Sequence, residues 1–104
     1  STNDPTIVRE LVIRLSQKLG RSLVNRGLSG RVVRIKLRMG DFVTFTRQES
    51  QDHPIQYAAD ISEVALRLTL REMLPGRVFR LVGVGMTGFD YGSEGTVQGR
   101  LEGL

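Results

Sequence analysis

Residues 31–47 constrain the fold of this chain more than any other segment, because two kinds of side chain alternate along them. The segment reads RVVRIKLRMGDFVTFTR. In its first half Val33, Ile35 and Leu37 alternate with cations, which is the period-two pattern of a strand with one buried and one exposed face. The cations are Arg34, Lys36 and Arg38. The pattern predicts a strand that lies on a core and presents positive charge on its other side.

The second half of this segment completes a hairpin. A turn at Gly40 and Asp41 leads into another alternating run over residues 42–48. One face of that run has Val43 and Phe45, and the other has Thr44 and Thr46. Phe42 falls on the threonine side by strict alternation, and we expect it to turn inward through a bulge or twist at the hairpin end. One hairpin face then carries cations and hydroxyls toward an anionic ligand.

Size and composition limit the class of protein. A chain of 104 residues with 39% apolar and 25% charged residues is typical of one globular domain. The apolar runs are too short to cross a bilayer, and the polar start shows no signal peptide. The chain has no cysteine, which excludes disulfides and thiolate metal sites and fits a reducing compartment. We therefore expect a cytoplasmic protein without contact to a membrane.

The charge is distributed unevenly along the chain. Residues 1–47 hold ten Lys/Arg and three Asp/Glu, whereas residues 48–104 hold five and eight. Thirteen of the fifteen cations are arginine, whose planar fork suits bidentate contacts to phosphate. A compositional bias of the genome toward arginine explains that ratio equally well. The asymmetry between the halves is not explained in this way, and it indicates an anionic partner, with nucleic acid as the first candidate.

Two helices are predicted. The first begins at Asp4 and Pro5 and ends at Gly27, with apolar residues at helical spacing between them. Gly20 inside it marks close packing or a bend. The second helix opens at Asp60, where residues 60–63 have the spacing of a capping box.

The remaining segments are a loop, a strand and a tail. Residues 49–57, ESQDHPIQY, are predicted as a polar loop that holds the only histidine. Residues 78–86, VFRLVGVGM, are predicted as an interior strand with Arg80 as its one charge. Gly83 and Gly85 leave one face of it bare, either for close helix packing or for close approach by a ligand backbone. Residues 88–104 are glycine-rich and predicted as a tail or loop, with a brief strand at Thr96 and Val97 as the alternative.

The order helix, strand, strand, helix, strand predicts an α+β fold in which two helices cover one face of an antiparallel sheet. We place the domain at residues 1–88 and a glycine-rich C-terminal tail at residues 89–104. No catalytic constellation is visible. Metal-dependent phosphoryl transfer needs clustered carboxylates that hold Mg²⁺, and the aspartates here fall at separate turns, caps and loops. A Walker-type loop is also missing. The chain is predicted to be non-catalytic and to bind no cofactor by itself.

Taken together, these segments resemble the C-terminal little finger (polymerase-associated) domain of Y-family translesion DNA polymerases such as DNA polymerase IV. The resemblance rests on VVRIKLRMGDFVTFTR, the polar loop and helix after it, and VFRLVGVGM, and it covers roughly residues 4–88. It implies a domain that grips the backbone of primer–template DNA during lesion bypass in DNA repair, without reading sequence, in the bacterial cytoplasm and associated with the nucleoid. Catalysis and Mg²⁺ would belong to the palm domain of the parent polymerase, which would be the other partner.

The resemblance also implies which residues contact DNA. Seven positions match the family's phosphate-contacting strands: Arg34, Lys36, Arg38, Thr44, Thr46, Arg47 and Arg80. Members often have a further basic residue in the last strand, where this chain has Leu81 and Gly85. From charge pattern alone, the cations are equally well explained as the solvated face of a half-exposed strand.

Two departures from the family pattern matter for the fold. The family's βαββαβ order begins with a strand, but only four residues precede Pro5 here. The first strand is therefore missing from the prediction, and either the tail or a second copy of the chain, by strand exchange or edge pairing, could fill the gap. The C-terminal sequence VQGRLEGL lacks the aromatic residue of the family's sliding-clamp peptide, so no clamp site is predicted.

Two other function classes stay open at this stage. An RNA-binding module of similar architecture would need aromatic residues on the open sheet face to stack bases, and only Phe42 could serve. A structural or oligomerising α+β module would show no salt-dependent affinity for DNA.

Overall fold

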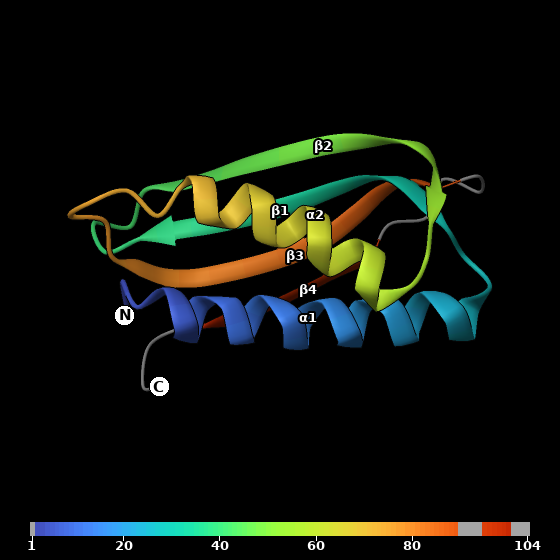
Figure 1. The fold of residues 1–104 in the computed structure, drawn as a ribbon, viewed down its shortest axis with the longest axis horizontal. Helices are drawn as coiled ribbons and strands as arrows, with labels where there is room; N and C mark the ends of the chain where they lie inside the picture. Colours follow the sequence, from blue (N-terminus) through green and yellow to red (C-terminus); the bar gives the residue numbers. More distant parts are fainter. Residues whose placement is uncertain (1, 90–94, 101–104) are drawn as a thin grey trace.

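The computed structural model describes residues 2–89 and 95–100, and within them it confirms the α+β fold. Figure 1 shows two helices lying side by side along one face of a sheet. The elements are α1 (Pro5–Arg26), β1 (Gly30–Met39), β2 (Thr44–Ile55), α2 (Ala58–Arg71), β3 (Phe79–Phe89) and β4 (Gly95–Arg100). The sheet has the order β2-β1-β3-β4, and all neighbouring strands are antiparallel.

The first helix forms for the reasons that its sequence gives. The Asp4 side chain accepts a hydrogen bond from the Thr6 amide at 2.9 Å, and Pro5 occupies the first turn, where it loses no hydrogen bond. Gly27 ends the helix at φ 63°, a left-handed conformation that favours glycine. The predicted bounds of α1 are therefore confirmed.

The core lies between the helices and one face of the two central strands. Opposite pairs from β1 and β3 meet on that face, such as Ile35 with Val84 and Leu37 with Val82, and all four side chains are fully buried. The stripe of α1 that contains Val12, Leu19 and Leu23 covers this face, and α2 packs beside α1. Burial of these aliphatic side chains contributes on the order of 1.5–3 kcal/mol each relative to exposure.

The strand β2 is longer than the sequence predicted. It extends through Ile55, so the prediction of a polar loop over residues 49–57 is wrong for most of that segment. Because β2 is the edge strand, it tolerates Pro54, which has no amide hydrogen for a ladder. Its polar composition arises because its helix-side residues meet the polar rim of α2, as the contact of Glu49 with Arg67 shows.

The second helix begins earlier than predicted. It starts at Ala58 with Tyr57 in the N-cap position, and Tyr57 makes no side-chain capping bond. The predicted capping box is therefore wrong, and Asp60 lies inside the first turn instead. There its carboxylate is favoured by the positive end of the helix dipole.

The far edge of β3 is occupied from within the same chain. Gly95–Arg100 forms β4, so the brief strand considered for this segment is present where a tail or loop was expected. Thr2 continues the same edge, exchanging two backbone hydrogen bonds of 3.0 and 2.9 Å with Phe79. Closing this edge does not require a second copy of the chain, and nothing in the described residues supports the alternative of a homo-oligomer.

Candidate nucleic-acid interface

The open face of the sheet, which we define as the side opposite the helices, carries a row of cations on β1. Arg34, Lys36 and Arg38 alternate with the buried aliphatics of the core, so they all point to this side. Their partners on β2 are Gln48, Thr46 and Thr44, in that order. Five of the seven predicted DNA contacts therefore share one surface, and they are Arg34, Lys36, Arg38, Thr44 and Thr46.

Neighbouring side chains on β2 hold two of these cations in place. The Arg34 Nε donates to the Gln48 side-chain oxygen at 3.3 Å, and the Arg38 Nε donates to the Thr44 hydroxyl at 3.0 Å. Each bond uses one of the several N–H donors of a guanidinium. Gln48 is a member of the site that the sequence analysis missed, although the alternation of Thr44 and Thr46 continues directly to it.

Two glycines on β3 border the row of cations on its other side. Gly83 lies opposite Lys36, and Gly85 lies opposite Arg34. These partners place both glycines on the open face, whereas the helix side of β3 carries Val82 and other aliphatics. Close helix packing is thus wrong as the explanation for the glycines. No side chain rises from β3 beside Arg34 and Lys36, and both glycines are nevertheless buried.

Arg47 lies on the other side of the sheet from Thr44 and Thr46. It pairs with the buried Ile35, and its Nε is 3.5 Å from a carboxylate oxygen of Glu72, at the end of α2. Its guanidinium also lies 4.6 Å from the centre of the Phe45 ring. The predicted DNA contact at Arg47 is therefore not brought together with the others.

Arg80 reaches the tip of the β1–β2 hairpin through a bulge. Arg38 pairs with Leu81 and Met39 with Phe79, so Arg80 is the extra residue of β3 at that point. Its guanidinium carbon lies 3.9 Å from the centre of the Phe42 ring. The expectation that Phe42 turns inward is wrong, because its side chain is 64% exposed. Its φ of 70° places it in the turn and not in the strand.

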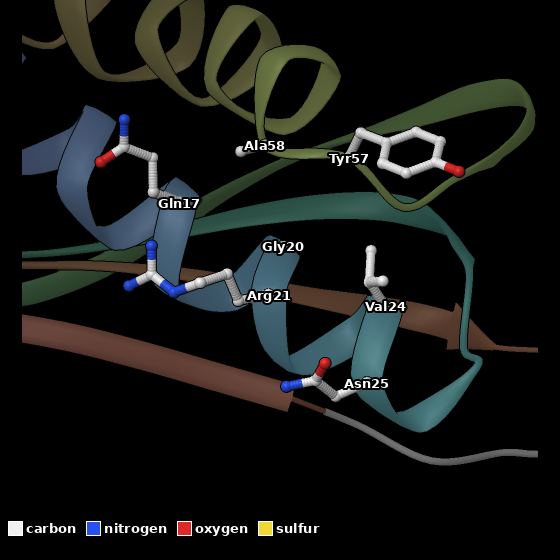
Figure 2. A pocket seen from close by; sticks show the side chains of 7 residues that line it. All are labelled: Gln17, Gly20, Arg21, Val24, Asn25, Tyr57 and Ala58. Carbon is white, nitrogen blue, oxygen red and sulfur yellow. The ribbon is translucent and has the colours of Figure 1, made fainter.

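A hollow lies on the helix layer, away from the open face. It has a volume of about 490 Å³ and lies where the end of α1 meets the start of α2. Figure 2 shows Gly20 facing Ala58, with Tyr57 and Val24 at one end of the hollow. Polar side chains from α1 line the rest of it, and they are Gln17, Arg21 and Asn25.

Within residues 2–89 and 95–100, no group of three or more His, Cys, Asp or Glu side chains could hold a metal ion. The same part of the chain has no helix long and apolar enough to cross a membrane. The prediction that the chain needs no cofactor stays a prediction.

Comparison with known proteins identifies the family. Residues 1–101 match the family described as the impB/mucB/samB family C-terminal domain. The chain belongs to this family. The resemblance to the little finger domain of Y-family polymerases, which rested on the hairpin and the last strand, is thereby confirmed.

Comparison with individual relatives is consistent with this family. A protein named DNA polymerase IV from Xanthomonas oryzae pv. oryzae is 37% identical over 93 residues, which is 88% of this chain and 26% of the relative. Its namesake in Dehalococcoides mccartyi is 38% identical over 90 residues, 85% of this chain and 23% of the relative. A third, from Streptococcus pneumoniae, is 37% identical over 83 residues, 80% of this chain and 23% of the relative. The chain thus spans about a quarter of the length of these relatives.

Proposed function

We propose that the open face binds the phosphate backbone of primer–template DNA, independently of sequence, as the accessory domain of a Y-family translesion polymerase. The observation that carries the proposal is the row of Arg34, Lys36 and Arg38 on a central strand, with the hydroxyls of Thr46 and Thr44 beside it on β2. A polar sheet face with a row of cations suits a ligand that is itself a regular charged surface.

The spacing of the row matches that ligand. Alternate residues of a strand recur about every 6.6 Å, which is near the separation of successive phosphates along one DNA strand. Cations and hydroxyls that contact phosphate position a protein on DNA without reading its bases. These features favour binding that is independent of sequence and lets the domain slide along any template.

The chemistry of the parent protein belongs to other parts of it. Relatives named DNA polymerase IV are about four times as long as the matched segment, so they have room for catalytic domains outside it. In this proposal those domains hold Mg²⁺ and perform nucleotidyl transfer, and the open face keeps the product duplex in register with them. Lesion bypass in DNA repair and a location in the bacterial cytoplasm, on the nucleoid, follow from the same proposal.

Salt-dependent binding tests the proposal directly. Fluorescence anisotropy with a labelled primer–template duplex at two salt concentrations compares the native chain with the Arg34→Ala/Lys36→Ala/Arg38→Ala variant. Loss of about three phosphate contacts lowers the slope of log affinity against log salt by roughly three, and affinity falls by at least tenfold. A charge-matched control, Arg9→Ala/Arg14→Ala/Lys18→Ala, removes two arginines and a lysine from the exposed side of α1.

The outcomes separate the function classes. If both triple variants lose affinity equally, net charge explains binding, and the open face has no special role. If neither variant differs from the native chain, or the native chain binds no DNA, the domain is structural and the proposal fails. Competition with duplex RNA of the same sequence separates a DNA-binding domain from an RNA-binding module, because A-form and B-form backbones differ in groove width.

A further inference from the structure

The tip of the β1–β2 hairpin carries an exposed aromatic ring at the end of the row of cations. Phe42 is 64% exposed, and its neighbour Val43 is 56% exposed. We propose that Phe42 is a stacking platform for one unpaired DNA base at the end of the duplex that the open face holds. This inference rests on the proposed function, to which it adds a contact with single-stranded template.

The backbone at Phe42 is held in an unfavourable conformation. Its φ of 70° is the only positive value among the described residues other than glycine. The left-handed region costs a bulky side chain free energy, and such strained positions cluster at functional sites. Hydrogen bonds of the turn impose the conformation: the Phe42 amide donates to the Met39 carbonyl at 3.0 Å, and the Val43 amide donates to the Asp41 carboxylate at 3.1 Å. The turn therefore presents the ring outward even though burial would favour the opposite.

Arg80 lies against one face of the Phe42 ring. Its guanidinium lies 3.9 Å from the ring centre, inside the range of a cation–π contact. Arg80 reaches this place only because the bulge in β3 inserts it beyond the regular pairing of Arg38 with Leu81. With one ring face against a cation, a flat π system is the partner best suited to the other face, since an aliphatic side chain would gain no stacking there.

The position of the ring decides which ligand it meets. Arg38 is the last cation of the row on β1, and Phe42 follows it directly across the turn. A DNA strand whose phosphates follow Arg34, Lys36 and Arg38 brings its next nucleotide to the hairpin tip. Within a duplex that base is already stacked on its neighbours, so only an unpaired base has a free face for Phe42. Stacking on aromatic residues tolerates any base, which fits binding without sequence preference.

The test compares two DNAs that differ only in single-stranded character. One is a blunt duplex, and the other is the same duplex with a short 5′ overhang that carries 2-aminopurine at its first unpaired position. Anisotropy gives the affinities, and quenching of 2-aminopurine reports stacking. The native chain is compared with Phe42→Leu, which keeps an apolar side chain, and with Phe42→Tyr, which keeps an aromatic ring. Val43→Ala is the matched control in the same turn.

The expected result is specific to the overhang. Phe42→Leu loses roughly tenfold in affinity for the overhang DNA, binds the blunt duplex as the native chain does, and no longer quenches 2-aminopurine. Phe42→Tyr and Val43→Ala behave as the native chain on both DNAs. Phe42→Gly keeps the fold, because glycine suits the left-handed conformation, and it loses affinity for the overhang DNA selectively, as Phe42→Leu does.

Two results overturn the inference. Equal quenching of 2-aminopurine by the native chain and Phe42→Leu would show that Phe42 does not stack on the unpaired base. The proposed binding of duplex DNA would not be affected by that result. Equal losses on blunt and overhang DNA would make Phe42 an ordinary duplex contact. If the native chain binds neither DNA, the proposed function fails as well, and the two failures are thereby distinguished.

Discussion

Arg47 on β2 and Glu72 at the end of α2 form an ion pair across 3.5 Å on the helix-covered side of the sheet. Glu72 also pairs with Arg77 at 3.0 Å, and both guanidinium groups lie over the Phe45 ring. This cluster of charged side chains around Phe45 links β2 to the end of α2. Arg47 therefore has a structural role that its place among the threonines of β2 did not indicate.

This placement predicts different effects for two arginines near the hairpin. Arg38→Ala removes a cation from the open face, so it should lower affinity for duplex DNA severalfold and reduce the salt slope by about one. Arg47→Ala should leave the slope nearly unchanged and cost about 1 kcal/mol of unfolding free energy, through the lost ion pair and the lost cation–π contact. Anisotropy at several salt concentrations and urea denaturation measure the two effects. Equal salt slopes for the two variants would show that Arg47 also contacts DNA.

A second ion pair between β2 and α2 predicts a response to acid. The Glu49 carboxylate accepts a hydrogen bond from Arg67 and another from Gln51, and these, with Arg67 first, hold its pKa below the ordinary value of 4.5. The pKa in the folded state is then lower than in the unfolded state. The resulting stabilisation is complete above pH 4.5 and is lost as the pH falls through the lower folded value.

Glu49→Gln tests this response. The variant should be less stable than the native chain at neutral pH, and the difference should shrink as the pH falls below about 4.5. Thermal denaturation across a pH series measures it. Glu10→Gln is the control, since Glu10 lies on the exposed side of α1 and forms no ion pair within the described part of the chain. A difference between native chain and Glu49→Gln that does not change with pH would contradict the linkage.

The first helix packs tightly against the start of α2 at Gly20, which predicts a cost for even a methyl side chain there. A Cβ at Gly20 would lie 2.8 Å from the Ala58 backbone nitrogen, and backbone cannot turn aside as a side chain can. Gly20→Ala should gain about 1 kcal/mol in helix propensity and lose more through displacement of α2, for a net destabilisation of about 1–2 kcal/mol. Urea denaturation measures this. A more stable Gly20→Ala variant would mean that α2 shifts without cost.

Periodicity in the sequence was enough to predict the parts of the fold in which one face is buried. The alternation over Val33, Ile35 and Leu37 gave the correct faces of β1, and Asp4 and Gly27 gave the correct ends of α1. The cations of the open face followed from the same alternation, because a side chain next to a core residue on a strand must point away from the core.

The sequence did not predict features that depend on tertiary contacts. The polar stretch around Glu49 is a strand because it pairs with β1, and its polar side chains show no apolar alternation from which a strand could be predicted. The bulge that inserts Arg80 is a difference in length between paired strands, which is visible only when both strands are aligned. The outward turn at Phe42 contradicts the preference of a phenylalanine for burial, and conflicts of this kind are expected at functional positions.

Two buried hydroxyls in the helices predict opposite effects of similar substitutions. Ser16 in α1 is fully buried, and its hydroxyl has no hydrogen-bond partner within the described part of the chain. Thr69 in α2 is equally buried, but its hydroxyl donates to the Ala65 carbonyl at 2.7 Å. An unsatisfied buried polar group costs about 1–3 kcal/mol, whereas a satisfied one contributes about 1 kcal/mol. Ser16→Ala should therefore stabilise the chain by about 1–2 kcal/mol, helped by the helix propensity of alanine, and Thr69→Val should destabilise it by about 1 kcal/mol. Urea denaturation of both variants measures the signs. Destabilisation by Ser16→Ala would reveal a partner for its hydroxyl, such as a water molecule held between α1 and the sheet.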